Sequence, residues 1–300
     1  MMRFNVVIVT FNRLALLKEC LNAVLSQTYD VNKVFVVDNC STDGTEEFLK
    51  TSTDERVTVF RTSDNIGGAG GFAEGVRLCE ESGDYDYVML IDDDAILASD
   101  CIEKIADAIK ANPNYPAYST VVQTKGQIDA GHRQKFVPKL LARLANITEQ
   151  EYANAYFECD VATFCGMVVN GDIVKSIGLP IADYFIWLDD VEYSVRIGKY
   201  GKILNVNNAF LNHKTYYLSP KLSMGWKSYY GYRNLIDITR RHMGLIATIY
   251  QILRITAYAM RFMMTGERVC GRNAFQLCGD AIFDGLKGRL GINKKYLPGT

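Results

Sequence analysis

The first third of the sequence alternates between short apolar runs rich in β-branched residues and segments whose apolar residues recur at helical spacing. A strand–helix–strand order of this kind is typical of an α/β fold in which most neighbouring strands are parallel. We therefore predict a Rossmann-like fold with a mostly parallel central sheet. The expected strands cover residues 4–10, 33–38, 57–62 and 87–92, and the expected helices cover residues 14–27, 45–50 and 72–81.

Polar residues follow each of these strands at its carboxyl end. Parallel strands end at the same edge of a sheet, where open α/β sheets bind their ligands, so we expect these residues to line one nucleotide-type site. Asp38 is suited to accept hydrogen bonds from a ribose hydroxyl or a base N–H. In chain order the polar segments are Thr10-Phe11-Asn12-Arg13, Asp38-Asn39, Asn65-Ile66-Gly67-Gly68 and Asp92-Asp93-Asp94.

The three consecutive aspartates at 92–94 follow the apolar run 87–91 directly. Adjacent carboxylates repel one another. A hard divalent cation that also binds an anionic oxygen of a ligand would relieve this repulsion, as in Mg²⁺ and Mn²⁺ sites that hold substrate phosphates. The alternative is a solvated, Asp-rich turn before a helix that starts near Asp100. The triplet alone does not separate the two interpretations.

A glycine-rich stretch, Gly67–Ala73, precedes the helix expected over 72–81. Read from Gly68, it matches the dinucleotide-binding pattern G-x-G-x-x-A, although that pattern belongs after the first strand and here follows the third. Glycines let a backbone approach a bulky ligand, and the N–H groups at the start of a helix favour an anion. The alternative is a flexible loop with a helix cap.

A second acidic pair, Asp189-Asp190, lies at the start of a helix expected over 189–200. Acidic residues in a first turn stabilise a helix through its dipole, so capping alone would explain the pair. The neighbouring Trp187, however, favours a site where a sugar ring stacks beside a catalytic base.

The middle third, residues 115–218, is less regular, with strands expected over 164–170 and 202–206. A lone histidine is more often structural than functional, and we interpret His132 and His242 in this way. His213, which follows the second of these strands, is kept as a candidate ligand.

Composition excludes several classes of protein. Hydrophobic residues make up 48% of the 300 residues and charged residues 22%, which is typical of a soluble globular enzyme and excludes a disordered chain. The eight cysteines stand singly, without a C-x-x-C pair, which indicates reduced cytoplasmic thiols rather than a disulfide framework or a zinc ribbon. No secretory segment is recognised at the N-terminus, so export is not expected.

The charge is unevenly distributed, because residues 221–300 carry 13 Lys and Arg against 4 Asp and Glu. The apolar stretch Leu245–Met264 is long enough to cross a bilayer, but Arg254 and Arg261 interrupt it. We predict that residues 219–300 form a basic, amphipathic helical region on the inner face of the cell membrane, which would make the protein cytoplasmic and peripherally membrane-bound. A buried or oligomer-forming helix is the alternative.

Several motifs occur together, in an order and at separations that resemble the family-2 inverting glycosyltransferases with the GT-A fold. They are Val7–Arg13, Val37-Asp38-Asn39-x-Ser41-x-Asp43-Gly44-Thr45, Asp92-Asp93-Asp94, Asp189-Asp190 and Tyr229-Tyr230-x-Tyr232-Arg233-Asn234. The resemblance implies a GT-A domain over residues 1–218, with a nucleotide-sugar half (1–115) and an acceptor half (116–218), followed by the C-terminal helical region.

The resemblance also implies which residues bind the two substrates. The donor, most simply a UDP-linked sugar, would be held by Thr10, Asn12, Arg13, Asp38, Asn39, Asn65, Gly67, Gly68, Asp92, Asp93 and Trp187. The acceptor or the transferred sugar would be contacted by Trp187, Tyr230, Arg233 and Asn234.

A divalent cation and a base complete the implied site. Mn²⁺ or Mg²⁺ would bind to Asp92, Asp94 and His213, with a slight preference for Mn²⁺ because imidazole suits it better. Asp190 would deprotonate the acceptor hydroxyl, and its neighbour Asp189 is the second candidate for that role.

The glycine-rich segment Asn65–Phe72 resembles the galactofuranosyltransferases more than the rhamnosyltransferases, which more often have one glycine after the Asn and then an aromatic residue. The segment 187–193 supports the same choice, although Leu188 separates the Trp from the acidic pair and the galactofuranosyl pattern has no such insertion. The resemblance thus implies UDP-galactofuranose as donor, with dTDP-rhamnose as the alternative. The acceptor would be a glycan or lipid-linked glycan in cell-surface polysaccharide synthesis.

Other functions are kept as alternatives. An NAD-dependent oxidoreductase would explain the glycine pattern but not the aspartate triplet. A non-catalytic nucleotide-sugar binding protein would share the same motifs. A glycoside hydrolase is disfavoured, because its two carboxylates do not require a parallel, nucleotide-type sheet. No nucleic-acid partner is expected, and homo-oligomerisation is compatible with the sequence.

Overall fold

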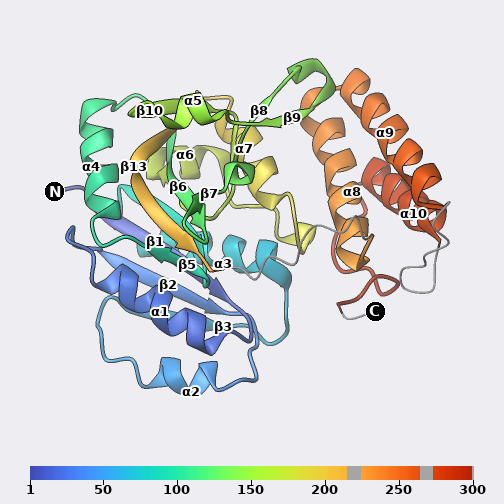
Figure 1. Ribbon diagram of the computed structural model, residues 1–300. Coiled ribbons are helices and arrows are strands. Elements are labelled where there is room, and N and C mark those ends of the chain that lie inside the picture. Colours follow the sequence, from blue (N-terminus) through green and yellow to red (C-terminus); the bar gives the residue numbers. More distant parts are fainter. Residues whose placement is uncertain (215–223, 264–272, 299–300) are drawn as a thin grey trace.

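The computed structural model describes residues 1–214, 224–263 and 273–298. Figure 1 shows an α/β body built around one large sheet, with a group of C-terminal helices beside it. The predicted α/β class is confirmed, because parallel pairs join the four N-terminal strands and helices alternate with them.

The large sheet has ten strands in the order β10-β13-β6-β12-β4-β1-β2-β3, with β5 paired to β13 and β7 to β6, and a small sheet has the order β11-β8-β9. The strands are β1 (Phe4–Thr10), β2 (Lys33–Asp38), β3 (Val57–Arg61), β4 (Tyr87–Asp92), β5 (Ala95–Leu97), β6 (Ala117–Thr124), β7 (Gln127–Ile128), β8 (Arg133–Phe136), β9 (Leu144–Asn146), β10 (Tyr156–Cys159), β11 (Val161–Ala162), β12 (Met167–Asn170) and β13 (Ile203–His213).

Strand β1 lies between β4 and β2, parallel to both. All of its residues are buried, which explains why it is a continuous apolar run rather than an alternating one. The register places Thr10 beside Asp38, and Val9 beside Asp92. Three strands therefore end with polar residues at the same edge of the sheet.

Helices cover both faces of the large sheet. Apolar residues of α1 and α4 pack with Val6 and Ile8 on one face, and those of α3, α6 and α7 pack with Val7 and Val9 on the other. The helices are α1 (Leu14–Leu25), α2 (Thr45–Lys50), α3 (Gly67–Ser82), α4 (Cys101–Ala111), α5 (Glu149–Tyr152), α6 (Gly171–Ile177), α7 (Asp189–Ile197), α8 (Trp226–Ile238), α9 (Leu245–Met263) and α10 (Ala274–Lys287), with short turns η1 (Ala130–His132), η2 (Lys139–Leu141), η3 (Ala182–Tyr184) and η4 (Thr239–Met243).

The glycine-rich stretch differs from its prediction, because it forms the first turns of α3 and not a loop before residue 72. Gly71 and Gly75 face β1, where an added Cβ would lie 2.5 Å from Val9 Cγ1 and 2.2 Å from Val7 Cγ1 respectively. These glycines allow the helix to lie close to the strand. Neither is one of the two glycines of the G-x-G-x-x-A match, Gly68 and Gly70. An added Cβ on Gly70 would lie 2.8 Å from Ile66 Cγ1, and one on Gly68 would meet no described atom within 4 Å.

Replacement of Gly75 by Ala is expected to lower the free energy of unfolding by about 1–3 kcal/mol, because the new methyl group would overlap Val7 in a closely packed interface. Urea unfolding measures the change. Gly279→Ala is the matched control, since Gly279 is exposed in α10 and an added Cβ meets no described atom within 4 Å. That change should raise stability by about 0.5–1 kcal/mol. Equal effects of the two substitutions would contradict the packing role.

The other large difference concerns β13, which was expected to end at residue 206 and instead continues to His213. Its register against β6 shifts between Val206 and Phe210. Beyond this irregularity the strand pairs with β5, and His213 lies opposite Ala95. The extension therefore places His213 opposite Ala95, the residue that directly follows the aspartate triplet.

The C-terminal helices α8, α9 and α10 share an apolar core that also includes Phe185 of the α/β body. The predicted boundary between residues 218 and 219 lies outside the described residues, as does Met264 at the end of the predicted apolar stretch. In the part of the chain that the structure describes, no helix combines the length and the apolar character needed to cross a membrane.

Candidate active site

Two adjoining cavities lie at the carboxyl edge of the parallel strands, a large one of about 700 Å³ and a small one of about 290 Å³. Arg13, Gly68, Asp92 and Ile186 line both. Of the predicted site residues, the large cavity is also lined by Asp94, Trp187, Asp189, Asp190 and His213, and the small one by Thr10, Asn39, Asn65, Gly67 and Asp93.

The three aspartates of the triplet have different environments. Asp93 is buried, and its carboxylate accepts hydrogen bonds from Thr10 Oγ1 at 2.8 Å and Arg13 Nη1 at 3.1 Å. Asp94 Oδ2 also accepts from Arg13 Nη1, at 2.7 Å. The side chain of Asp92 has no hydrogen bond or ion pair to the described part of the chain, and it lines both cavities. Burial, together with Asp94 and Asp93, raises the pKa of Asp92 to about 7.

Because burial and the neighbouring carboxylates disfavour the charged form of Asp92, Asp92→Asn is expected to stabilise the metal-free protein at pH 8 by about 1–3 kcal/mol, since one pKa unit corresponds to ~1.4 kcal/mol. The folded-state pKa of Asp92 lies above its ordinary value, so the charged carboxylate destabilises the fold at high pH. The stabilisation should therefore shrink as the pH falls below 7 and vanish below ~4.

Urea unfolding of both proteins across this pH range measures the effect. The exposed Asp107, which pairs with Lys110 on α4, is the matched position. Asp107→Asn should change stability by less than about 0.5 kcal/mol at any of these pH values. A pH-independent effect of Asp92→Asn would show that burial and the neighbouring carboxylates do not disfavour its charged form.

Asp94 and His213 form a pair that could hold a cation. Asp94 Oδ1 lies 3.2 Å from His213 Nε2, and both side chains line the large cavity with Asp92. The buried Asp94 Oδ1 accepts no hydrogen bond from the described residues. Carboxylate and imidazole groups of this kind are ligands for Mn²⁺ and, through the carboxylates, for Mg²⁺. The residues present therefore fit the divalent cation that the sequence implied.

The second acidic pair forms the start of α7 and lines the same large cavity. Burial raises the pKa of Asp190 to about 6, although its Oδ1 accepts a hydrogen bond from the backbone N–H of Val191 at 2.7 Å. Burial and the charge of Asp190 raise the pKa of Asp189 well above its usual value. A carboxylate with a pKa near 6 suits a general base at neutral pH.

Arg133, which sequence reasoning missed, is fully buried beside this region. Its guanidinium donates to the backbone carbonyl groups of Thr120 at 2.8 Å and Cys165 at 2.9 Å. Its positive charge works against the rise in the pKa of Asp190. Arg133 could not be predicted as a site residue from the sequence, because it lies in an irregular region without a motif.

Two cationic side chains line the small cavity. Arg13 lines it, and so does Lys227, whose Nζ lies 5.5 Å from the centre of the Trp226 ring. Burial lowers the pKa of Lys227, and the nearby Arg13 lowers it further. An anionic ligand between these cations would relieve their repulsion. From the sequence, Trp226-Lys227 was counted only as part of the basic C-terminal region. An aromatic residue next to a lysine is a signal by which the pair could have been predicted to lie in a nucleotide site.

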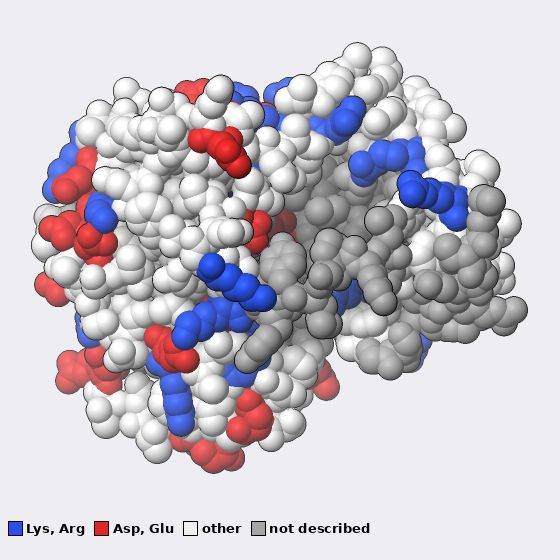
Figure 2. Space-filling view, in the orientation of Figure 1, with Lys and Arg blue, Asp and Glu red and all other residues white. Residues whose placement is uncertain are grey.

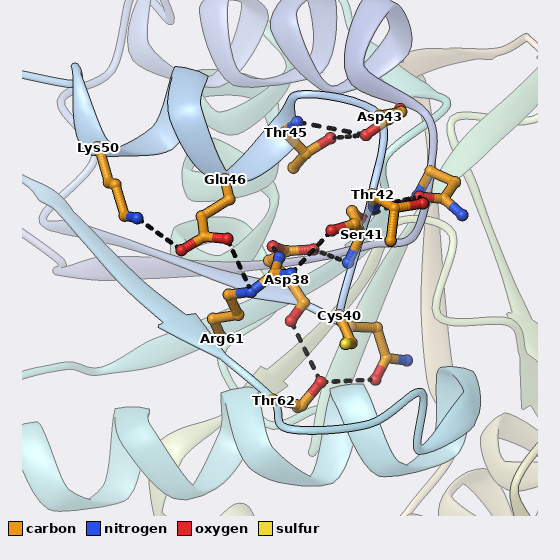
Figure 3. Close-up of polar contacts among 12 residues, drawn as sticks. Asp38, Cys40, Ser41, Thr42, Asp43, Thr45, Glu46, Lys50, Arg61 and Thr62 are labelled. Atoms are coloured by element: carbon orange, nitrogen blue, oxygen red, sulfur yellow. Dashed lines mark hydrogen bonds and ion pairs between the residues drawn. The ribbon is translucent and has the colours of Figure 1, made fainter.

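Asp38 and Asn12 line neither cavity, in contrast to the predicted contact with the nucleoside. Asp38 is fully buried, accepts from the backbone N–H of Ser41 at 2.9 Å and pairs with Arg61, as Figure 3 shows. Asn12 Oδ1 accepts from the backbone N–H of Thr42 at 2.7 Å. The two residues shape the loop after β2, because Arg61 lies in register with Asp38 on the neighbouring strand and neutralises it.

Tyr230, Arg233 and Asn234 were predicted to contact the acceptor, but they are fully buried and line neither cavity. Arg233 Nη2 donates to the carbonyl of Tyr184 at 3.0 Å, and Asn234 Nδ2 donates to that of Trp187 at 2.7 Å. These residues hold the segment before α7, in which three non-glycine residues have positive φ. They therefore support the cavity wall from behind and do not line either cavity.

The C-terminal helices and the small sheet complete the large cavity, which the sequence did not predict. Their lining residues are Gln134, Leu144, Ser228, Gly231, Tyr232, Leu235 and Arg254, and His132 and Thr163 line the cavity next to the small sheet.

The family model described as "Glycosyl transferase family 2" matches residues 5–178, which is more than half of the chain. A curated relative, "Glycosyltransferase GlyA" of Streptococcus pneumoniae serotype 4 (strain ATCC BAA-334 / TIGR4), is 25% identical over 235 residues. That match covers 77% of this chain but only 30% of GlyA.

Solved structures share the fold at low identity. A crystal structure of GalNAc-T7 with UDP, GalNAc and Mn²⁺ has a TM-score of 0.64 and 14% identity, covering 96% of this chain and 56% of that one. A crystal structure of S. aureus TarS 1-349 in complex with UDP-GlcNAc has a TM-score of 0.60 and 14% identity, covering 95% and 81%. These similarities place the α/β body in the GT-A fold.

Proposed function

Because the chain belongs to glycosyl transferase family 2, we propose that it moves a sugar from a nucleotide-diphosphate donor to a hydroxyl group, with inversion and with a divalent cation. One observation carries the proposal. Asp92 and Asp94 of the triplet line the walls of one cavity together with the Asp189-Asp190 pair, which lies about a hundred residues later in the sequence. The adjoining small cavity is lined by the cationic side chains of Arg13 and Lys227, which are suited to bind a diphosphate.

The donor would bind with its nucleoside in the small cavity. Asn65 offers an amide group there, and Trp226 offers an aromatic face. The amide of Asn39 is bonded to the backbone of Ile66 and Gly67 and shapes the cavity wall. Arg13 and Lys227 would contact the diphosphate, because charge-assisted hydrogen bonds to phosphate are strong and the two cations otherwise repel each other. The sugar would then extend past Asp92 into the large cavity, where Trp187 and the base candidates lie.

Asp92, Asp94 and His213 would hold Mn²⁺ or Mg²⁺. Such a cation neutralises the developing charge of a nucleoside diphosphate leaving group, so that no general acid is needed. The GalNAc-T7 structure contains Mn²⁺ together with UDP. The mixed oxygen and nitrogen ligands here support Mn²⁺ over Mg²⁺.

Asp190 would act as the general base. It would accept the proton of the acceptor hydroxyl while the hydroxyl oxygen forms a bond to the anomeric carbon and the bond to the diphosphate breaks. Attack from the face opposite to the leaving group inverts the configuration. Trp187, which is half-exposed at the cavity, would stack against a sugar ring.

The proposed donor is UDP-galactofuranose, with dTDP-rhamnose as the alternative, and the proposed acceptor is a glycan or lipid-linked glycan. A screen of UDP- and dTDP-sugars for metal-dependent nucleotide release tests this. We expect release from one donor with Mn²⁺ and none after chelation. Release without any metal would overturn the proposed chemistry. Saturable donor binding without any turnover would favour the non-catalytic binding protein.

The C-terminal helices support a second part of the proposal, namely that the enzyme binds the inner, anionic face of the cell membrane. Apolar residues of α9 at helical spacing are exposed, among them Leu245 at 73% and Leu253 at 64%. Arg254 and Arg261 of the same helix are exposed beside them. In Figure 2 the side chains over the upper right of the molecule are white or blue.

Co-sedimentation with vesicles tests this docking. The protein should bind vesicles that contain phosphatidylglycerol, be released by high salt and bind neutral phosphatidylcholine weakly, because each nearby cation contributes about 1 kcal/mol. Leu253→Ser should weaken binding, whereas Val59→Ser on the exposed side of β3 should not. A dimer in solution that Leu253→Ser dissociates would favour an oligomer-forming helix instead.

A further inference from the structure

Two of the three histidines of the chain, His132 and His213, lie together at the large cavity, and the carboxylate of Asp129 lies beside them. Asp129, His132 and His213 each offer one ligand atom that lies within 4.8 Å of those of the other two. His132 Nε2 is 3.6 Å from Asp129 Oδ2. The rings of His132 and His213 meet edge to face, with their centres 5.1 Å apart.

Neighbouring groups hold this cluster in place. Thr163 Oγ1 lies 2.7 Å from His132 Nδ1, which leaves the Nε2 atom directed at Asp129. Thr124 Oγ1 donates to Asp129 Oδ2 at 3.1 Å, and the backbone N–H of Gly131 donates to its Oδ1 at 3.2 Å. Outer hydrogen bonds of this kind orient the ligands of metal sites.

The third member, His213, is fixed by its backbone. It is the last residue of β13, and it pairs there with β5. Its buried Nδ1 has no hydrogen-bond partner among the described residues. A metal ion would bind this nitrogen. In a histidine with a purely structural role, the nitrogen would form a hydrogen bond instead.

The ligand set indicates which ion would bind. Zn²⁺ binds imidazole nitrogen and carboxylate oxygen at about 2.0–2.2 Å, so neighbouring ligands of a tetrahedral site lie about 3.4 Å apart. The His132–Asp129 separation of 3.6 Å is close to this value. A site with two imidazoles binds Zn²⁺ more tightly than Mn²⁺ and disfavours Mg²⁺. His132 and His213 face the cavity, which leaves a fourth position for water.

We propose that Asp129, His132 and His213 form a second metal site, which takes Zn²⁺ and competes for His213 with the cation bound by Asp92 and Asp94. The zinc site itself does not depend on the proposed function. Only the competition rests on it. Zn²⁺ would then inhibit Mn²⁺-dependent sugar transfer, because an imidazole held by zinc is drawn away from the donor-side cation.

Titration of metal-depleted protein with Zn²⁺, in competition with a chromogenic chelator and without any donor, tests the site. We expect one tightly bound Zn²⁺ per chain and at least a tenfold loss of affinity in His132→Gln. His242→Gln is the matched histidine control, because His242 pairs with Glu192 outside the cluster, and it should bind as the native chain does. Asp94→Asn should retain zinc, because it alters only the donor-side site.

Asp129→Asn provides a second variant if His132→Gln does not fold, and it should weaken zinc by at least tenfold. Zinc affinity that is lost in Asp94→Asn and kept in His132→Gln and Asp129→Asn would place the ion in the donor-side site and overturn the proposal. The absence of tight zinc binding, or binding that none of these variants changes, would overturn it as well. These results are independent of whether any nucleotide sugar is turned over.

Discussion

Asparagine in place of Asp190 is expected to lower kcat for sugar transfer by ~10²–10⁴-fold, because a positioned general base contributes about that much. Donor affinity should change little, since the small cavity that would bind the nucleotide does not include Asp190. The side-chain oxygen of Asn can still accept from the backbone N–H of Val191, so the start of α7 is preserved. Nucleotide release with acceptor present gives kcat, and calorimetry gives donor affinity.

The exposed Asp183, a few residues before this pair, is the matched control. Asp183→Asn removes a carboxylate from the same segment without touching either cavity and should keep full activity. If Asp190→Asn keeps full transferase activity while Asp189→Asn loses it, the roles of the two carboxylates are reversed. If both variants stay active, the base lies elsewhere.

The pH dependence gives an independent test of the same assignment. A base must be deprotonated to act, and burial raises the pKa of Asp190 to about 6. The value of kcat should therefore rise with pH through about 6 and level off above ~7, falling roughly tenfold per pH unit on the acid side. Asp190→Asn should lack this acid limb. If kcat of the variant falls at low pH as it does in the native protein, a group other than Asp190 causes the fall.

Asp94→Asn is expected to lower metal-dependent turnover at least ~100-fold at limiting Mn²⁺, because a bound cation contributes several kcal/mol to stabilising the leaving group. The variant loses a charged ligand, but its side chain keeps an oxygen to accept from Arg13. We therefore expect the Mn²⁺ concentration for half-maximal rate to rise, with partial recovery at high Mn²⁺.

A titration of the nucleotide-release rate with Mn²⁺ measures both effects. Asp107→Asn on α4 serves as the control, because its exposed carboxylate lies outside the cavities, and it should follow the native curve. A native half-saturation by Mn²⁺ in Asp94→Asn would remove Asp94 from the cation site.

Much of the α/β body could be predicted from local patterns. Strand β1 is a mostly apolar run whose residues are all buried, and β2 and β4 are buried at all but one residue each, so their bounds follow from sequence. Their C-terminal polar residues share an edge because parallel strands end together. Residues such as Asp92, Asp94 and Asn39 therefore reach the cavities from elements that local sequence already specifies.

Site residues were harder to predict where a long-range partner determines the direction of a side chain. Asp38 was expected to face the nucleoside, yet Arg61 on the next strand pairs with it. Arg233 and Asn234 were expected to face the acceptor, yet they donate hydrogen bonds to backbone carbonyl groups before α7, inside the protein. A motif shows that a polar residue is needed, but not which buried group it satisfies.

Sequence alone determined the α/β class and the two acidic clusters, because hydrophobic periodicity and strand ends are local properties. Only the tertiary structure decided that the glycine-rich stretch packs on β1, that Lys227 joins Arg13, and that His132 reaches His213. Each of these depends on the close packing of segments that are distant in the chain. Whether two such segments meet depends on shape and burial over the whole fold, which no local pattern of residues contains.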